Sequence, residues 1–239
     1  MKNKFCGYVI DSIDYKDNDS IVTILCEDGL VSLKARGTKK ITSKMNSILF
    51  NYAYSEFEVN KSEKSGYLTL LDGTLLNYPN YVINSLDYMT IMGIISEGIN
   101  KCKDNANLYT AFKDCLALME NGVNSRALII GFLNFMLESE GIKYEGDKCL
   151  SCLSKKVSSF SYEMGGFLCN KCSNINEDVA YLKTMRVLTK IDLKNAIKIK
   201  EVNKNFDIYI EHAFESLESK CGIYFKGKEF LLRVLKMEG

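Results

Sequence analysis

The sequence lacks the features that mark several classes of protein. No window of its 239 residues offers about 18 uninterrupted apolar residues, and the start, MKNKFCGYVIDSIDY, has no apolar segment of the kind found in export signals. The sequence therefore predicts neither a membrane span nor export. The formal net charge is only +1, from 31 Lys and Arg against 30 Asp and Glu, which excludes a strong attraction of the whole molecule to polyanions. Local clusters of charge matter more than the total.

Motifs of common enzyme classes are also missing. The chain contains no GxxxxGK[ST], GxGxxG, HExxH or GxSxG pattern. Its single histidine, His212, lies in IEHAFESL on an expected amphipathic helix without companion catalytic residues. A structural or solvated histidine is favoured there, and a binding protein is favoured over an enzyme.

Cysteine is present in an odd number, nine, which does not suit a framework of disulfides. Five of the nine are scattered through apolar, periodic segments, as expected of buried free thiols in a reducing compartment. They are Cys6, Cys26, Cys102, Cys115 and Cys221. We therefore expect a cytoplasmic protein.

The patterning predicts two domains of different classes. Period-two alternation between turn residues predicts five strands, at residues 5–13, 20–26, 30–36, 48–59 and 67–76. Five short strands in so few residues are typical of a small closed barrel of the OB type. After the single proline, Pro79, apolar residues recur at helical spacing, including residues 108–119, 125–140, 178–191, 206–220 and 228–237. We expect an α+β protein with a barrel domain at residues 1–78 and a helical domain at 79–239.

Four cysteines form a metal-binding pattern inside the helical domain. CLSC at 149–152 and CNKC at 169–172 are separated by 16 residues, which lies within the spacing of zinc ribbons. Two such knuckles close a tetrahedron and leave no position for water, so the pattern predicts a structural zinc ion. The predicted ligands are Cys149, Cys152, Cys169 and Cys172, in a module at residues 147–173.

Other interpretations of these cysteines are a pair of redox CxxC motifs, paired core cysteines and an iron–sulfur cluster. One feature departs from the usual knuckle, in which glycine often follows the second cysteine. Here Leu153 and Ser173 occupy those positions. We expect the absence of these glycines to affect how tightly the site binds the metal and not whether the site exists.

Two stretches concentrate positive charge. Residues 31–54 contain no acidic residue and five basic ones, Lys34, Arg36, Lys39, Lys40 and Lys44. Alternation in VSLKAR places Lys34 and Arg36 on the outer face of the barrel, where a positive surface suits single-stranded nucleic acid. Candidates for stacking on bases are Tyr8, Tyr15, Tyr52 and Tyr54. Alternatively, these cations only solvate the sheet and the tyrosines belong to the core.

The second basic stretch lies between residues 181 and 205, where only Asp192 and Glu201 offset seven cations. These are Lys183, Arg186, Lys190, Lys194, Lys198, Lys200 and Lys204. The sequence leaves two interpretations open: a continuation of a nucleic-acid track, or a groove for an acidic partner peptide.

The order of these features resembles the bacterial RecO family of recombination-mediator proteins over essentially the whole chain. The marks are GYVIDSIDYKDNDSIVTILCEDGLVSLKARGTKKITSK, above all EDGLVSLKARGTKK, and the ending GGFLCNKC of the cysteine module. The resemblance implies an OB fold, a helical domain with an inserted zinc module, and a non-enzymatic role in DNA repair and recombination. It also implies binding of single- and double-stranded DNA, strand annealing, and work with RecR and the acidic C-terminal tail of single-stranded DNA-binding protein to load RecA. It makes Lys34, Arg36, Lys39, Lys40 and Lys44 candidate DNA contacts, in a protein of the cytoplasm and nucleoid.

Two hypotheses from other classes remain. The chain could be a zinc-stabilised scaffold whose basic patches bind acidic protein surfaces without touching DNA. It could also be a redox enzyme that uses the CxxC pairs, although a tetrahedral zinc ion would sequester those thiols.

Overall fold

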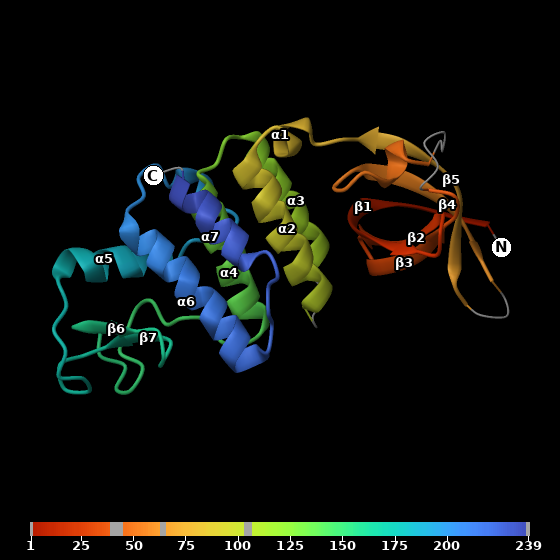
Figure 1. Cartoon of the computed structure of the whole chain (residues 1–239). Coiled ribbons are helices and arrows are strands. Elements are labelled where there is room, and N and C mark those ends of the chain that lie inside the picture. The colour runs from red at the N-terminus through yellow and green to blue at the C-terminus, as the bar shows by residue number, and fades with distance from the viewer. Residues whose placement is uncertain (1, 39–44, 63–65, 103–106, 238–239) are drawn as a thin grey trace. The chain divides into compact units, whose positions relative to one another are not determined.

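The computed structural model describes residues 2–38, 45–62, 66–102 and 107–237 (Figure 1). The chain forms two compact units. The first comprises Met1–Asn80 and Asn105–Thr110, and the second comprises Tyr81–Asp104 and Ala111–Gly239. A barrel followed by a helical region confirms the expected fold class.

The first unit is built on a closed five-stranded barrel. Its strands are β1 (Lys2–Tyr15), β2 (Asp19–Cys26), β3 (Gly29–Ala35), β4 (Tyr54–Lys61) and β5 (Leu68–Asn77). The order around the barrel is β1-β2-β3-β5-β4, and β4 pairs with β1 to close it. All neighbours are antiparallel except β3 and β5, which run parallel. This is the five-stranded, Greek-key arrangement of OB-type barrels.

Alternating side chains fill the barrel. Val9, Val22, Ile24 and Phe57 are each 0% exposed and belong to one apolar cluster. Burying one such side chain contributes about 1.5–3 kcal/mol, so the side chains that point into the barrel are the main source of its stability. The side chains that point outward are not needed to fill the core.

One predicted strand begins too early. We expected residues 48–59 to be extended, but Ser47–Leu49 form the short 3-10 helix η1, and β4 begins only at Tyr54. Ile48 is 3% exposed within the barrel core, and its carbonyl accepts a hydrogen bond of 3.1 Å from Ser55 Oγ. The apolar residues of this segment are buried from a turn, which alternation alone does not distinguish from a strand.

The second unit is a helical bundle around α4. Its helices are α1 (Asn80–Ile83), α2 (Leu86–Lys101), α3 (Leu108–Glu120), α4 (Ser125–Ser139), α5 (Val179–Leu188), α6 (Lys204–Cys221) and α7 (Lys228–Met237), with a 3-10 turn, η2 (Ala196–Lys198). The first turn of α3 is assigned to the first unit. α4 packs against α2 and α6, and its residues Leu128, Phe132 and Met136 are 0% exposed. Among the described residues, no helix combines the length and apolar character needed to cross a membrane.

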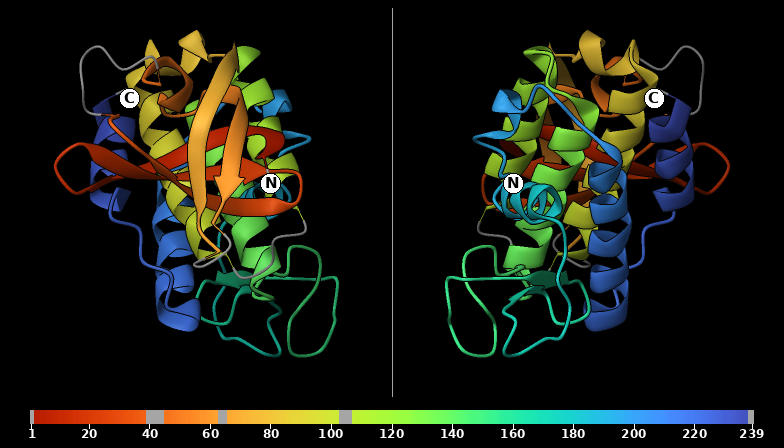
Figure 2. Two further views of the ribbon diagram at one scale, coloured as in Figure 1. Left: turned by 90° about the vertical axis from the view of Figure 1, so that its right-hand side faces the viewer. Right: turned by 90° about the vertical axis from the view of Figure 1, so that its left-hand side faces the viewer.

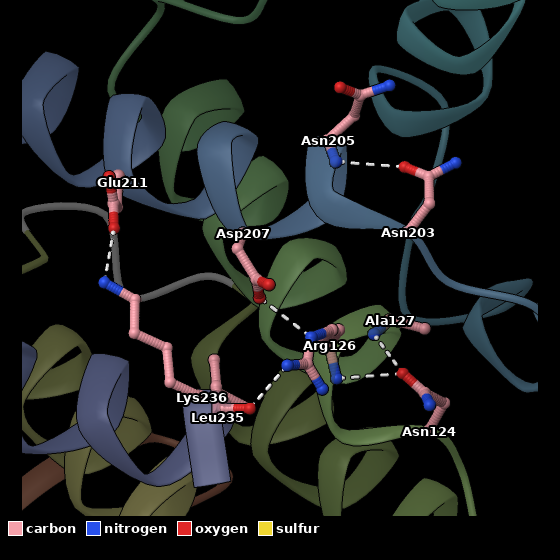
Figure 3. Close-up of polar contacts among 9 residues, drawn as sticks. All are labelled: Asn124, Arg126, Ala127, Asn203, Asn205, Asp207, Glu211, Leu235 and Lys236. Atoms are coloured by element: carbon pink, nitrogen blue, oxygen red, sulfur yellow. Dashed lines mark hydrogen bonds and ion pairs between the residues drawn. The ribbon is translucent and has the colours of Figure 1, made fainter. Parts of the chain in front are cut away.

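A buried arginine joins three helices of this bundle (Figure 3). Arg126 of α4 is 8% exposed and donates from Nε to Asp207 Oδ1 of α6 at 2.8 Å. It also donates to the carbonyl of Leu235 in α7. Asn124 precedes it as the N-cap of α4 and accepts from the backbone N–H groups of Arg126 and Ala127. The charge of Arg126 is therefore paired and hydrogen-bonded, as a buried charge requires.

Candidate metal centre and nucleic-acid surface

The four knuckle cysteines lie together in the second unit. The sulfur atoms of Cys149, Cys152, Cys169 and Cys172 are all within 4.8 Å of one another. The Sγ atoms of Cys152 and Cys169 are 3.4 Å apart. In a tetrahedral zinc centre with Zn–S bonds of about 2.3 Å, the sulfurs stand about 3.8 Å apart. The four cysteines could therefore hold one metal ion.

Backbone turns bring the cysteines of each pair together. The N–H of Leu153 donates to the carbonyl of Cys149 at 2.9 Å, and the N–H groups of Cys172 and Ser173 donate to the carbonyl of Cys169 at 2.9 Å. Leu153 has a positive φ of 60°, in the left-handed region where glycine is favoured. The first knuckle thus adopts the conformation that usually calls for glycine, with a leucine in that position.

The thiols differ in how readily they ionise. Burial raises the pKa of Cys149, but N–H groups of Cys152 and Cys169 outweigh it and lower that pKa to about 6. The side chains of Cys152 and Cys169 raise the pKa of Cys172 to about 12. A divalent cation among the sulfurs would stabilise all four as thiolates, because a coordinating thiol is deprotonated. Four soft sulfur donors fit zinc or an iron–sulfur cluster better than magnesium or calcium.

A short hairpin connects the two knuckles, a feature that the sequence did not predict. It consists of β6 (Ser159–Ser161) and β7 (Gly166–Leu168), with Phe160 paired to Phe167. Gly166 runs against Glu145, whose carbonyl oxygen would lie 2.7 Å from an added Cβ. These three-residue strands are too short to produce a visible alternation.

The hairpin β6–β7 lies beside α6 (Figure 2), and aromatic side chains hold the module there. Tyr144 makes edge-to-face contacts with Phe160 and Tyr209, and its hydroxyl donates to the carbonyl of His212 at 3.1 Å. Tyr162 stacks on His212 with ring centroids 3.9 Å apart. His212 is also paired with Glu215 at 2.8 Å. The cysteine module is a docked part of the helical unit.

One cation of α5 and one that follows it reinforce the docking. Lys190 follows α5 and pairs with Asp147 at 2.5 Å, and the Arg186 guanidinium lies 5.4 Å from the centroid of the Phe167 ring. Two of the seven cations in the second basic stretch are thus engaged with the module.

The structure describes two of the five candidate DNA contacts on the barrel. Lys34 and Arg36 stand at the end of β3, whereas Lys39, Lys40 and Lys44 lie outside the described residues. Lys34 is half-buried and paired with Asp19 of β2 at 3.0 Å. Hydrogen bonds from Lys34 and from the N–H of Gly37 lower the pKa of Asp19, so it is ionised at neutral pH. The charge of Lys34 is therefore largely compensated within the barrel.

The candidate stacking tyrosines differ in exposure. Tyr52 is 8% exposed, and Tyr8 and Tyr54 pack on each other with ring centroids 4.7 Å apart. Tyr15 is 37% exposed, and the Lys34 ammonium lies 4.8 Å from its ring centroid. Of the four, Tyr15 is the one that combines exposure with an adjacent cation.

Comparison with known proteins agrees with this architecture. The family model described as "Recombination protein O N terminal" matches residues 1–78. The DNA repair protein RecO of Mesoplasma florum is 28% identical over 233 residues, covering 92% of this chain and 87% of the relative. That of Halalkalibacterium halodurans is 29% identical over 248 residues, covering 97% and 94%. A Bacillus cereus protein of the same name is 27% identical over 251 residues and the full length of both chains. With a family-model match over its barrel and similarity along its whole length to proteins named DNA repair protein RecO, the chain is similar to the RecO family over both of its units.

Proposed function

We propose that this protein is a mediator of DNA repair and homologous recombination. It binds single- and double-stranded DNA, anneals complementary strands and, with RecR and single-stranded DNA-binding protein, promotes the loading of RecA. The observation that supports this most is the closed barrel of order β1-β2-β3-β5-β4 within the residues that match the RecO N-terminal model. Barrels of this kind hold strands through a positive groove and stacked bases.

The two parts of the chain have separate roles in this proposal. Residues 1–78 act as the DNA-binding domain, with Lys34, Arg36, Lys39, Lys40 and Lys44 as phosphate contacts. Residues 79–239 recruit protein partners, including the acidic tail of single-stranded DNA-binding protein. Catalysis is not part of this role, since the protein acts by holding strands.

The cysteine module at residues 147–173 holds a structural zinc ion in this proposal. Support comes from the four sulfurs within 4.8 Å and from the aromatic docking of the module on α6. Four protein ligands complete a tetrahedral shell, so the ion would stabilise the module and would not bind substrate.

The test is binding of a fluorescently labelled single strand, followed by anisotropy over a range of salt concentrations. The wild-type protein should bind with a log–log salt slope of about −0.7 per phosphate contacted, and should accelerate annealing of complementary strands. Changing Lys34→Gln together with Arg36→Gln should reduce the magnitude of that slope by about 1.4 if each contacts one phosphate. The control is Lys61→Gln, an exposed lysine of β4.

One observation favours a second candidate, the scaffold that binds acidic protein surfaces. Because Asp19 pairs with Lys34, the described part of the barrel is less positive than its sequence indicates. If the protein neither binds nor anneals DNA at low salt but retains affinity for acidic peptides, the scaffold is correct and the mediator is not.

A further inference from the structure

Strands β1, β2 and β3 lie side by side in the barrel (Figure 1), and their outer face carries exposed apolar side chains. Ile13 of β1 lies opposite Ile21 of β2, and Tyr15 lies two residues further along β1 on the same face. Ile13, Ile21 and Tyr15 are 59%, 36% and 37% exposed. We refer to these three residues as the exposed platform. Exposed aromatic and apolar side chains beside a cation suit the stacked bases of a single strand.

An ion pair lies beside this platform. Lys34 of β3 is opposite Ile21, and Asp19 of β2 is opposite Tyr15, so both residues share the face of the platform. The Nζ atom of Lys34 is 3.0 Å from Asp19 Oδ2 and 4.8 Å from the centroid of the Tyr15 ring. A phosphate of a strand on the platform would meet this ammonium group, which the carboxylate of Asp19 already binds.

The carboxylate of Asp19 is fixed by a second contact. Its Oδ1 atom accepts from the backbone N–H of Gly37 at 3.1 Å, while Oδ2 binds Lys34. The hydroxyl groups of Ser20 and Thr38, 2.8 Å apart, hold the same two segments together. Hydrogen bonds from Lys34 and Gly37 lower the pKa of Asp19, so its charge persists at neutral pH. A strand therefore meets a negative charge that cannot turn away without losing the bond to Gly37.

This fixed charge opposes the binding of a phosphate in two ways. To bind the phosphate, Lys34 must give up its pair with Asp19 or share its ammonium group between two anions. The phosphate also comes close to the carboxylate, and like charges at short range repel each other. Both effects lower the affinity for a strand, and neither depends on the base sequence.

We propose that Asp19 is an internal competitor for Lys34, which weakens the contact between the barrel and a phosphate of a bound strand. The proposal rests on the proposed DNA-binding function and adds a residue that limits its affinity. Asp19 acts through Lys34 and does not itself bind the strand. A weaker contact lets the strand dissociate more readily, as a protein that transfers strands requires.

The main experiment makes the change Asp19→Asn in the full chain. Asparagine keeps an oxygen that accepts from the N–H of Gly37, but its neutral amide does not form an ion pair with Lys34. Affinity for a labelled oligothymidylate strand, measured by anisotropy, should rise about two- to five-fold, the range set by the modest strength of a partly exposed ion pair. The measurement is made at about 0.1 M salt, where the Debye length is about 10 Å.

The control is Asp28→Asn, which removes the same charge from the same unit. Asp28 is exposed in the turn between β2 and β3, at the opposite end of β2 from Asp19. Because screening limits the reach of an exposed charge, this change should leave the affinity nearly unaltered. Circular dichroism and thermal melting establish that the variants fold, and Asp19→Ser, which also removes the charge, replaces Asp19→Asn if that variant does not.

A double-mutant cycle tests whether the gain arises through the lysine. In a Lys34→Gln background, Asp19→Asn should raise affinity no more than Asp28→Asn does, because no ammonium group remains to be released. A merely structural role of Asp19 would not produce this result, since damage to the fold weakens binding whether or not Lys34 is present.

Amine reactivity examines the ion pair in the absence of DNA. Acetylation of Lys34 by an amine-reactive ester, read by mass spectrometry, should be faster in Asp19→Asn than in wild-type protein and unchanged in Asp28→Asn. Unchanged reactivity in Asp19→Asn, equal affinities of Asp19→Asn and Asp28→Asn, or an equal gain in both backgrounds would each overturn the competitor proposal and leave DNA binding standing. If neither wild-type protein nor any variant binds the strand, the proposed DNA-binding function fails and this proposal fails with it.

Discussion

At the scale of single residues, Leu153 illustrates a conflict between side chain and backbone. It has a φ of 60° and is 63% exposed, so little packing compensates for its conformation. A left-handed conformation costs a residue with a Cβ about 1–2 kcal/mol, and glycine avoids that cost while losing about 0.5–1 kcal/mol of chain entropy. We expect Leu153→Gly to stabilise the cysteine module by about 0.5–1 kcal/mol, measured as a higher melting temperature.

The control for this prediction is Leu153→Ala, which removes the exposed leucine side chain but keeps the Cβ. An equal gain from alanine and glycine would show that side-chain exposure, and not backbone conformation, limits the stability of this knuckle.

Residue-level prediction from the sequence succeeded where the cause was local. The CxxC spacing brings the two cysteines of each pair together because each pair needs only one turn of backbone, whereas the two pairs meet through β7, whose Phe167 carbonyl accepts from the N–H of Leu150 at 2.9 Å. The ion pair of Lys34 did not follow from the sequence, because its partner, Asp19, precedes the acid-free stretch and meets Lys34 only through the pairing of β2 with β3. Spatial neighbours of this kind are invisible to a count of charges along the chain.

At the scale of elements, Arg126 links three helices through its guanidinium group. Changing Arg126→Ala removes the donor to Asp207 and to the Leu235 carbonyl, and leaves an unpaired carboxylate in a partly buried position. We expect a loss of about 3 kcal/mol in the free energy of unfolding, measured by urea denaturation followed by circular dichroism.

Lys236→Ala supplies the comparison for Arg126. Lys236 lies on α7 and pairs with Glu211 at 3.4 Å on the exposed surface (Figure 3). Such a pair contributes about 0–1 kcal/mol. A loss for Arg126→Ala no larger than that for Lys236→Ala would mean that the buried arginine does not join the helices energetically.

The apolar periodicity of the sequence predicted the boundaries of an element correctly only where that element is a regular helix or strand with one buried face. The expected helix at 228–237 coincides with α7, whose Leu231, Val234 and Leu235 are buried at helical spacing. The segment at 48–53 failed because Ile48 and Tyr52 are buried from irregular backbone, including a positive φ at Tyr52. Periodicity in a sequence reports which side chains are buried. Because irregular backbone can bury alternate side chains as a strand does, the sequence pattern does not distinguish the two.

At the scale of the whole molecule, the cysteine module should contribute stability to one unit and not to the other. If the cysteines hold the proposed zinc ion, its removal with a strong chelator should release the contacts of Tyr144 and Tyr162 with α6, because repulsion between the ligands would open the knuckles. We expect faster hydrogen exchange in α6 and unchanged exchange in β2. The measurement is hydrogen exchange with mass spectrometry on the intact chain, alongside metal analysis.

The metal analysis separates the possible occupants of this site. One zinc per chain agrees with the proposal, whereas iron with sulfide would identify a cluster. Unchanged exchange in α6 after complete removal of zinc would show that the aromatic contacts alone hold the module.

The closure of the barrel also has a consequence for the order of folding. β1, β2 and β3 follow one another through short turns, so their pairing joins residues that are near in sequence. The two remaining seams join distant residues: β3 meets β5 through pairs such as Leu33 with Leu68, and β1 meets β4 through pairs such as Phe5 with Phe57. Because non-local contacts must first overcome the entropy of loop closure, we expect these two seams to form after the local pairings. Until they form, the strands on either side of each seam are open edges, and the nascent protein is most exposed to association with other chains during that interval.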